Sequence, residues 1–289
     1  MQIGVLYPQM QAGGDPSHAA RFAKAVEHLG FDYLLVTDHP LGAAHVDRDP
    51  PLEGDTDENN TFHDPFVLLG YLAGVTRRIE FATGVLVLPQ RQTALVARQA
   101  ADVDLFSGER LRLGVGVGWN YVEFQGLGED FKTRGARQEE QIELMRTLWS
   151  EPVVDFTGRF HRIDRAGINP RPKRSIPIWS GGFGERAWDR AARLSDGFIF
   201  WGYGGVDEAV KTIADIRERV TSYGRSAADF GGEYTSLKNL SDNLIDECNG
   251  WREGGGTHFA VSTLDFGFDK DIDAHIEYIT KVAKGLGVS

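Results

Sequence analysis

An aspartate and a histidine stand side by side where an apolar segment ends near the N-terminus. The run Val36-Thr37-Asp38-His39-Pro40 closes this segment, FDYLLVTD over 31–38, which has the composition of a buried strand. Histidine titrates near neutral pH, so its imidazole can give or take a proton. In a barrel of parallel strands, the C-terminal strand ends carry the reacting groups. We predict that His39 and Asp38 are catalytic; the alternative is that they only shape a strand–loop junction.

Two glycine-containing segments could make room for a flat ligand. In TGVLVLP, over 83–89, a glycine inside a β-branched strand indicates a bulge or the close approach of another group. In LGVGVGWN, over 113–120, the glycines at 114, 116 and 118 alternate and leave one strand face without side chains. Bulky neighbours or a ring system must fill that space.

A third glycine segment, WSGGFGERA over 179–187, places a strand end, two glycines and a helix start in succession. Exposed N–H groups at a helix N-terminus bind anions. We predict a phosphate site made by the Ser180 hydroxyl and the amides of Gly181 and Gly182; the alternative is a tight turn. Phosphate sites in barrels more often follow strands seven and eight, whereas this one follows the predicted fifth.

Short apolar runs alternate with amphipathic stretches along the whole chain, which predicts a parallel sheet and an α/β fold. Eight such units make a (β/α)8 TIM barrel. An open doubly wound sheet is the alternative, but no GxGxxG fingerprint follows the first strand. The predicted strands cover 3–7, 31–38, 79–88, 111–118, 176–182, 196–201, 231–237 and 257–262. Helices are predicted from Asp15 to Gly30, from Asp64 onward, and over 92–106, 133–149, 185–194, 206–223, 239–253 and 269–285.

The length of 289 residues suits one barrel of roughly 250 residues with insertions. We predict a single domain over 1–289, with insertions at about 42–63, 150–175 and 225–238. The second includes a β-hairpin over 153–163. The first is rich in acidic residues, proline and glycine, which is typical of a lid or a disordered loop.

Composition argues against two classes of partner, nucleic acids and membranes. A net charge of −11 argues against nucleic-acid binding, and no apolar run approaches the ~20 residues of a membrane span. The lone Cys248 cannot form an intrachain disulfide, which favours a reducing, cytoplasmic setting. His45, Asp47 and His63 match no metal-binding spacing, so no metal is expected. Arg134 and Arg137 either form surface ion pairs or frame a pocket.

These motifs together resemble the bacterial luciferase-like superfamily of flavin and deazaflavin barrels. The resemblance lies in TDH (37–39), ATGVLVLPQR (82–91), the stretches over 98–120 and 126–149, and IPIWSGGFGERAWDRAARLSDGF (176–198). It covers most of the chain and is weakest over 42–63 and after 225. Within the superfamily, the chain looks most like coenzyme F420-dependent oxidoreductases.

The resemblance implies a luciferase-like barrel that binds an isoalloxazine-like ring at its C-terminal mouth, with His39 beside the ring as proton donor or substrate contact. It also implies a non-prolyl cis peptide at Gly84–Val85, whose bulge backs the ring, and a homodimer. The residues implied to bind the cofactor are Asp38, Thr83, Gly84, Val85, Gly116, Val117, Gly118, Trp119, Ser180, Gly181, Gly182 and Phe183.

Three functions remain open at this point. The first is a coenzyme F420-dependent oxidoreductase that transfers a hydride between the deazaflavin and a small organic substrate. The second is an FMN-dependent monooxygenase that receives reduced flavin from a separate reductase. The third is a non-catalytic deazaflavin carrier. The cofactor supplies the difficult chemistry in the first two cases, and the protein supplies orientation and electrostatics.

Overall fold

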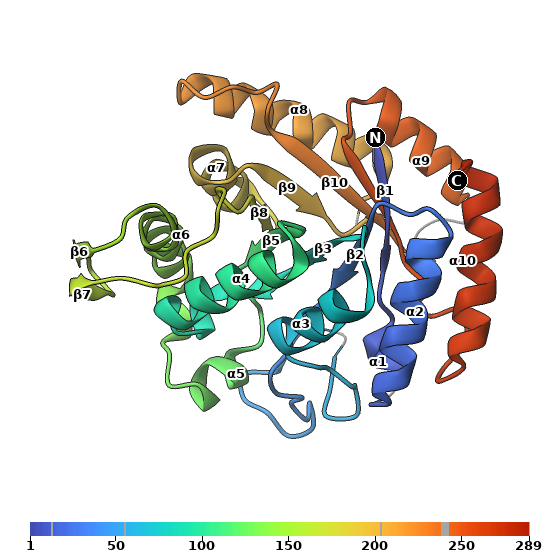
Figure 1. Cartoon of the computed structure of the whole chain (residues 1–289), viewed down its shortest axis with the longest axis horizontal. Helices are drawn as coiled ribbons and strands as arrows, with labels where there is room; N and C mark the ends of the chain where they lie inside the picture. The colour runs from blue at the N-terminus through green and yellow to red at the C-terminus, as the bar shows by residue number, and fades with distance from the viewer. Residues whose placement is uncertain (13, 55, 203, 238–242, 289) are drawn as a thin grey trace.

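Eight parallel strand positions close into a barrel (Figure 1). The computed structural model describes residues 1–12, 14–54, 56–202, 204–237 and 243–288. Hydrogen-bonded neighbours follow the order β3-β2-β1-β11-β10-β9-β8-β5-β4, and β3 also pairs with β5, which confirms the predicted closed barrel. The strands are β1 (Gln2–Leu6), β2 (Tyr33–Val36), β3 (Glu80–Thr83), β4 (Leu86–Val87), β5 (Leu111–Gly116), β8 (Ile178–Gly181), β9 (Gly197–Phe200), β10 (Gly231–Ser236) and β11 (His258–Val261).

The third strand position is broken in two. β3 and β4 are separated by Gly84 and Val85, and the peptide bond between these two residues is cis, as the sequence resemblance implied. The strand predicted over 79–88 is therefore present in two parts, with the bulge that its glycine indicated between them. Its second half starts a new pairing, in which Leu86 and Val87 lie opposite Val115 and Gly116 of β5.

In the described part of the chain, eight long helices surround the strands, and the first two begin at predicted caps. The Asp15 carboxylate accepts a hydrogen bond from the Ser17 amide at 2.8 Å, and Asp64 accepts one from the Phe66 amide at 3.0 Å. Among the described residues, no helix is long and apolar enough to cross a membrane. The helices are α2 (Pro16–His28), α3 (Pro65–Val75), α4 (Thr93–Ser107), α6 (Arg134–Ser150), α7 (Glu185–Leu194), α8 (Val206–Ser222), α9 (Leu244–Glu253) and α10 (Ile272–Leu286).

Four short helical segments were not predicted: α1 (Gln9–Ala12), η1 (Leu88–Gln90), α5 (Tyr121–Gly126) and η2 (Phe131–Thr133). Each has at most six residues, so tertiary contacts rather than helix propensity decide whether it forms. The helix predicted over 239–253 is observed from Leu244, and its first residues, up to 242, lie outside the described part of the chain.

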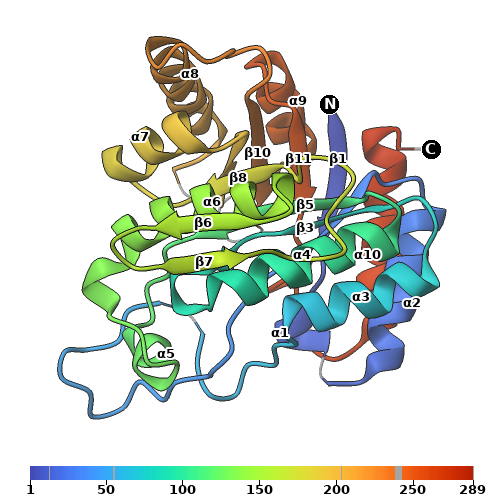
Figure 2. The ribbon, with the colours of Figure 1, turned by 60° about the vertical axis from the view of Figure 1, so that its left-hand side comes forward.

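The predicted insertion near 153–163 is an antiparallel hairpin, β6 (Val154–Thr157) and β7 (Arg162–Ala166), which lies outside the barrel (Figure 2). Glu140 on α6 anchors it. The carboxylate accepts hydrogen bonds from the Phe160 amide at 2.9 Å and the His161 amide at 2.7 Å. The Nδ1 atom of the His161 ring also lies 2.7 Å from Glu140 Oε1, and its Nε2 atom lies 2.7 Å from the Thr93 hydroxyl.

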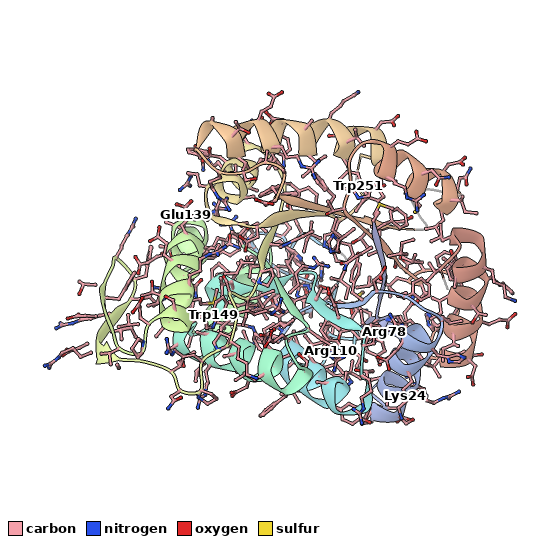
Figure 3. The ribbon with its side chains drawn as sticks, turned by 45° about the horizontal axis from the view of Figure 1, so that its top comes forward. Lys24, Arg78, Arg110, Glu139, Trp149 and Trp251 are labelled. Atoms are coloured by element: carbon pink, nitrogen blue, oxygen red, sulfur yellow. The ribbon has the colours of Figure 1, made fainter. Side chains whose placement is uncertain are left out.

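The space between strands and helices is an apolar core bounded by two indole rings (Figure 3). Trp149 on α6 donates a hydrogen bond to the Ala97 carbonyl at 2.9 Å, and Trp251 on α9 donates one to the His258 carbonyl at 2.7 Å. Each buried N–H thus finds an acceptor while the ring adds a large apolar area.

The N-terminal half of the barrel interior is filled by a charged and aromatic cluster. Arg112 and Glu233 form a buried ion pair at 2.5 Å, and the Arg112 guanidinium lies 4.3 Å from the Trp179 ring centre and 5.0 Å from that of Tyr33. Gly4 makes room for the Tyr33 ring, because a Cβ there would lie 2.4 Å from it. The C-terminal ends of the strands lie on the other side of this cluster.

His258 gives the fold a measurable pH dependence. Burial, followed by nearby Arg112, lowers the pKa of His258 to about 2. In the unfolded chain the ring is protonated below about pH 6.5. Between these values the unfolded state binds more protons, so the free energy of unfolding falls as pH falls, by about 1.4 kcal/mol per pH unit from this residue.

We expect His258→Gln to remove this slope in urea unfolding curves recorded between about pH 6 and pH 4. His28→Gln, at an exposed position of α2, should keep the wild-type slope. If the pH dependence of the His258→Gln variant equalled that of the wild type, the assignment of the slope to His258 would be wrong.

Candidate functional site

His39 lies at the C-terminal end of β2, at the mouth of the barrel. Its Nδ1 atom is 3.2 Å from Oε1 of Glu123 on α5. Its ring contacts Phe62, with ring centres 4.9 Å apart, and Trp119, with centres 5.6 Å apart. The imidazole is thus held by two segments that are distant in sequence, one at Phe62 and one at Trp119–Glu123. In Figure 1, α5 lies at the end of the barrel opposite the labelled N-terminus.

Asp38 is turned away from the imidazole and holds the strands together. Its carboxylate accepts hydrogen bonds from Arg91, at 2.6 Å from Nη2 and 3.1 Å from Nε, and from the Val87 amide at 3.0 Å. Burial raises the pKa of Asp38, and the Arg91 guanidinium opposes this shift. Asp38 was predicted to be catalytic together with His39, but the acid in contact with the imidazole is Glu123.

The cis bulge rests on glycines of two neighbouring strands. A Cβ on Gly116 would lie 2.4 Å from one methyl of Val85, and a Cβ on Gly181 would lie 2.8 Å from the other. A Cβ on Gly114 would lie only 1.8 Å from the Thr83 carbonyl oxygen. The strand face that these glycines leave without side chains was predicted to hold either bulky neighbours or a ring system. In the structure, the Val85 side chain and the Thr83 carbonyl occupy it. Val85 itself stays half-exposed at the mouth.

Gly118 turns the chain from β5 into α5. Its φ is 71°, and a Cβ there would lie 2.5 Å from Val87. Gly118 therefore lies in the turn and not in the strand, which ends at Gly116. The Asn120 side chain then caps α5 by accepting a hydrogen bond from the Val122 amide at 3.1 Å. This turn brings Trp119 and Glu123 to His39, and leaves the adjoining Val117 half-exposed.

The segment over 42–63, predicted as a lid or a disordered loop, packs on the same turn. Tyr121 donates a hydrogen bond to the Pro50 carbonyl at 2.8 Å, and the His45 Nε2 atom lies 3.0 Å from the Thr56 carbonyl oxygen. A Cβ on Gly54 would lie 2.5 Å from the Trp119 ring. In the described parts of this segment, these contacts make a cover beside the barrel mouth.

The predicted phosphate segment follows β8 and enters α7. Gly182 and Gly184 have φ values of 147° and 80°, and Gly184 is the N-cap of α7, whose N-terminus no side chain caps. Phe183 is exposed. The Ser180 hydroxyl is 2.6 Å from the Ser195 hydroxyl and buried. Because side chains alternate along a strand, Ser180 faces away from the barrel interior, which corrects its predicted use as a phosphate ligand.

Arginines gather where α6 and α7 begin. The Arg134 guanidinium lies 3.9 Å from the Phe131 ring centre, and burial followed by nearby Arg190 lowers the pKa of Arg134. In the described chain, neither Arg134 nor the exposed Arg186 forms an ion pair, whereas Arg137 pairs with Glu129 at 2.6 Å. Arg137 is thus an ion-pair residue, and Arg134 is available to an anion.

Comparison with known proteins places the chain in a family. The family model described as luciferase-like monooxygenase matches residues 1–232. An uncharacterised protein of Mycobacterium tuberculosis is 34% identical over 209 residues, which are 71% of this chain and 72% of that protein. The chain therefore belongs to the luciferase-like monooxygenase family, as its motifs implied.

Two further matches, one in sequence and one in fold, carry different activities in their names. A pyrimidine monooxygenase of Allorhizobium ampelinum is 31% identical over 176 residues, 58% of this chain and 47% of that enzyme. The solved structure of an F420-dependent secondary alcohol dehydrogenase, in complex with an F420-acetone adduct, covers 99% of this chain and 98% of its own. It superimposes with a TM-score of 0.78 at 18% identity, which shows a shared fold.

Glu123 and Arg91 are site residues that sequence reasoning missed. The pattern Asn120-x-x-Glu123 is that of a helix N-cap followed by an acidic residue at N3, so it could have indicated the start of α5. The pattern does not indicate that the carboxylate reaches His39, because β2 and α5 are far apart in sequence. Arg91 was contained in the motif ATGVLVLPQR, without an assigned partner.

The seating of Val85 on Gly116 predicts a specific stability change. Gly116→Ala should lower the free energy of unfolding by about 1–3 kcal/mol, because the added methyl overlaps Val85. Gly70→Ala on α3, where a Cβ meets nothing within 4 Å, should be neutral or stabilising by up to about 1 kcal/mol. Urea unfolding measures both. Equal stability of Gly116→Ala and wild type would contradict the observed contact.

Proposed function

We propose that the protein is a coenzyme F420-dependent oxidoreductase that transfers a hydride between the deazaflavin and a small organic carbonyl, alcohol or activated alkene. The observation that carries this proposal is the juxtaposition of a fixed imidazole and a half-exposed peptide bulge at one mouth of the barrel. The fold shared with an F420-dependent alcohol dehydrogenase supports it. The residues at the mouth must also fit the cofactor.

The ring would lie on the bulge formed by Gly84 and Val85. Gly116 and Gly181 seat this bulge, so side chains there would displace it. The cofactor phosphate would meet the uncapped N-terminus of α7 at Gly182–Gly184, with Arg134 supplying positive charge. Both parts of the site therefore fit a phosphorylated, ring-bearing group. When bound, a deazaflavin supplies a carbon that accepts or donates a hydride.

A residue of the chain, His39, accepts or donates the proton that accompanies the hydride. In the oxidation of an alcohol, the bound cofactor would accept the C–H hydrogen together with its electron pair as a hydride. The O–H proton passes to His39, and the C=O bond forms; reduction is the reverse. Phe62 and Trp119 flank the imidazole and limit access of water to it.

We further propose that the protein is a homodimer and is located in the cytoplasm. Analytical sedimentation tests the first part, and cell fractionation tests the second.

The second candidate is an FMN-dependent monooxygenase in the same pocket. The description of the matching family and the pyrimidine monooxygenase relative favour it. Oxygen consumption that requires substrate, FMN and an added flavin reductase would distinguish it from hydride transfer to or from F420. A carrier would bind F420 but show no absorbance change with any substrate.

Titration with each cofactor tests the proposal. We expect F420 to bind with micromolar or tighter affinity and FMN more weakly, by fluorescence quenching. Gly182→Asp should weaken F420 binding more than Gly182→Asn, because only the aspartate adds negative charge near the phosphate while both share the same backbone strain. Binding of FMN alone would overturn the choice of cofactor. Equal effects of Asp and Asn would place the phosphate elsewhere.

Replacement of His39 tests the proton step. His39→Asn should slow hydride transfer by roughly 10²–10⁴-fold and leave the F420 dissociation constant nearly unchanged. Stopped-flow absorbance of the deazaflavin measures the rate. His45→Gln, in the covering segment, is the control and should retain most of the activity. Unaltered turnover of His39→Asn would remove His39 from the mechanism.

A further inference from the structure

Glu123 is a buried carboxylate that contacts a histidine ring. Its side chain is 1% exposed, and Oε1 lies 3.2 Å from His39 Nδ1 and 3.4 Å from the Leu41 amide nitrogen. Within the described residues, no lysine or arginine forms an ion pair with it. Burial of an ionised carboxylate is unfavourable unless donors or a positive charge compensate it. The imidazole is the side chain placed to do so.

The contact determines which ring nitrogen carries hydrogen. An ionised carboxylate only accepts hydrogen bonds, so the nitrogen that faces Glu123 must donate. The neutral imidazole is then the tautomer with hydrogen on Nδ1 and a lone pair on Nε2. The hydrogen bond to one nitrogen of a histidine thereby sets the chemistry of the other.

We propose that Glu123 is a positioning residue that holds His39 in the Nδ1–H tautomer, so that Nε2 exchanges the proton with the substrate oxygen. The role in turnover rests on the proposed function, whereas the tautomer is a property of the chain alone. When Nε2 takes the proton of an alcohol, the ring becomes a cation beside the Glu123 carboxylate. In the reduction direction, the same cation returns the proton from Nε2 to the new alkoxide oxygen.

A second role of Glu123 must be separated from this one. The carboxylate also accepts from the Leu41 amide, just before the covering segment, so its loss could disturb that segment without any effect on the proton. A purely structural anchor would change stability or KM. A positioning residue changes the protonated nitrogen of His39 and kcat.

The test begins with the wild-type protein without cofactor, labelled with 15N-histidine. Long-range 1H–15N spectra at a pH where His39 is neutral distinguish the two tautomers, and the His39→Asn variant identifies the signal among eight histidines. We expect hydrogen on Nδ1. Hydrogen on Nε2 would overturn the proposal, and this measurement requires no variant of Glu123.

The variants Glu123→Met and Glu123→Gln complete the test. Methionine removes the acceptor, so the Nδ1–H preference should disappear; glutamine keeps an acceptor oxygen and should retain that preference at least in part. For substrate turnover with F420, we expect kcat of Glu123→Met to fall at least about tenfold, with KM and F420 affinity changed less than about threefold. Should Glu123→Met not fold, Glu123→Gln and the wild-type spectrum still decide.

An unchanged tautomer in folded Glu123→Met, or a loss of activity confined to KM, would contradict the proposal. The expected tautomer together with no F420 turnover in the wild type would contradict the proposed function instead, because the spectra do not depend on the cofactor.

Discussion

The contact of the Val85 side chain with a glycine in each of two neighbouring strands is the constraint on which the mouth of the barrel depends. Gly116 and Gly181 leave the space that this side chain occupies. The third strand can therefore break after Thr83 and resume at Leu86. A protein interior is close-packed, so a single added methyl at either glycine would have to move the bulge.

The consequences of the break extend to the histidine. The resumed strand presents the Val87 amide to Asp38, and Arg91, just beyond η1, binds the same carboxylate. Asp38 thereby fixes the end of β2 from which His39 extends. Its role is structural in the described geometry, although it stands next to the reacting group in sequence. The bulge and the imidazole are parts of one connected arrangement.

The periodicity of the chain predicted the barrel, its strand order and most helices, because each unit buries a local apolar face. The capping residues Asp15 and Asp64 and the helix over 185–194 illustrate this, since local hydrogen bonds and composition determine them. Ser180 was misjudged because the alternation of side chains in a strand directs its hydroxyl and Gly181 to opposite faces. Asp38 was misjudged because adjacency in sequence is not contact. Glu123 was missed because a tertiary contact, across 84 positions, defines it.

Charged groups lie at both ends of the barrel, paired at the N-terminal end and, among the described residues, without an ion-pair partner at Arg134 near the C-terminal end. The Arg112–Glu233 pair closes the interior at the N-terminal side, while Arg134 and the start of α7 offer positive charge at the other end. A crystal structure with bound F420 tests this arrangement most directly. The account predicts the deazaflavin ring in van der Waals contact with Val85, its phosphate at Gly182–Gly184, and Nε2 of His39 open to the substrate side. A ring bound away from the bulge, with its phosphate remote from α7, would contradict it.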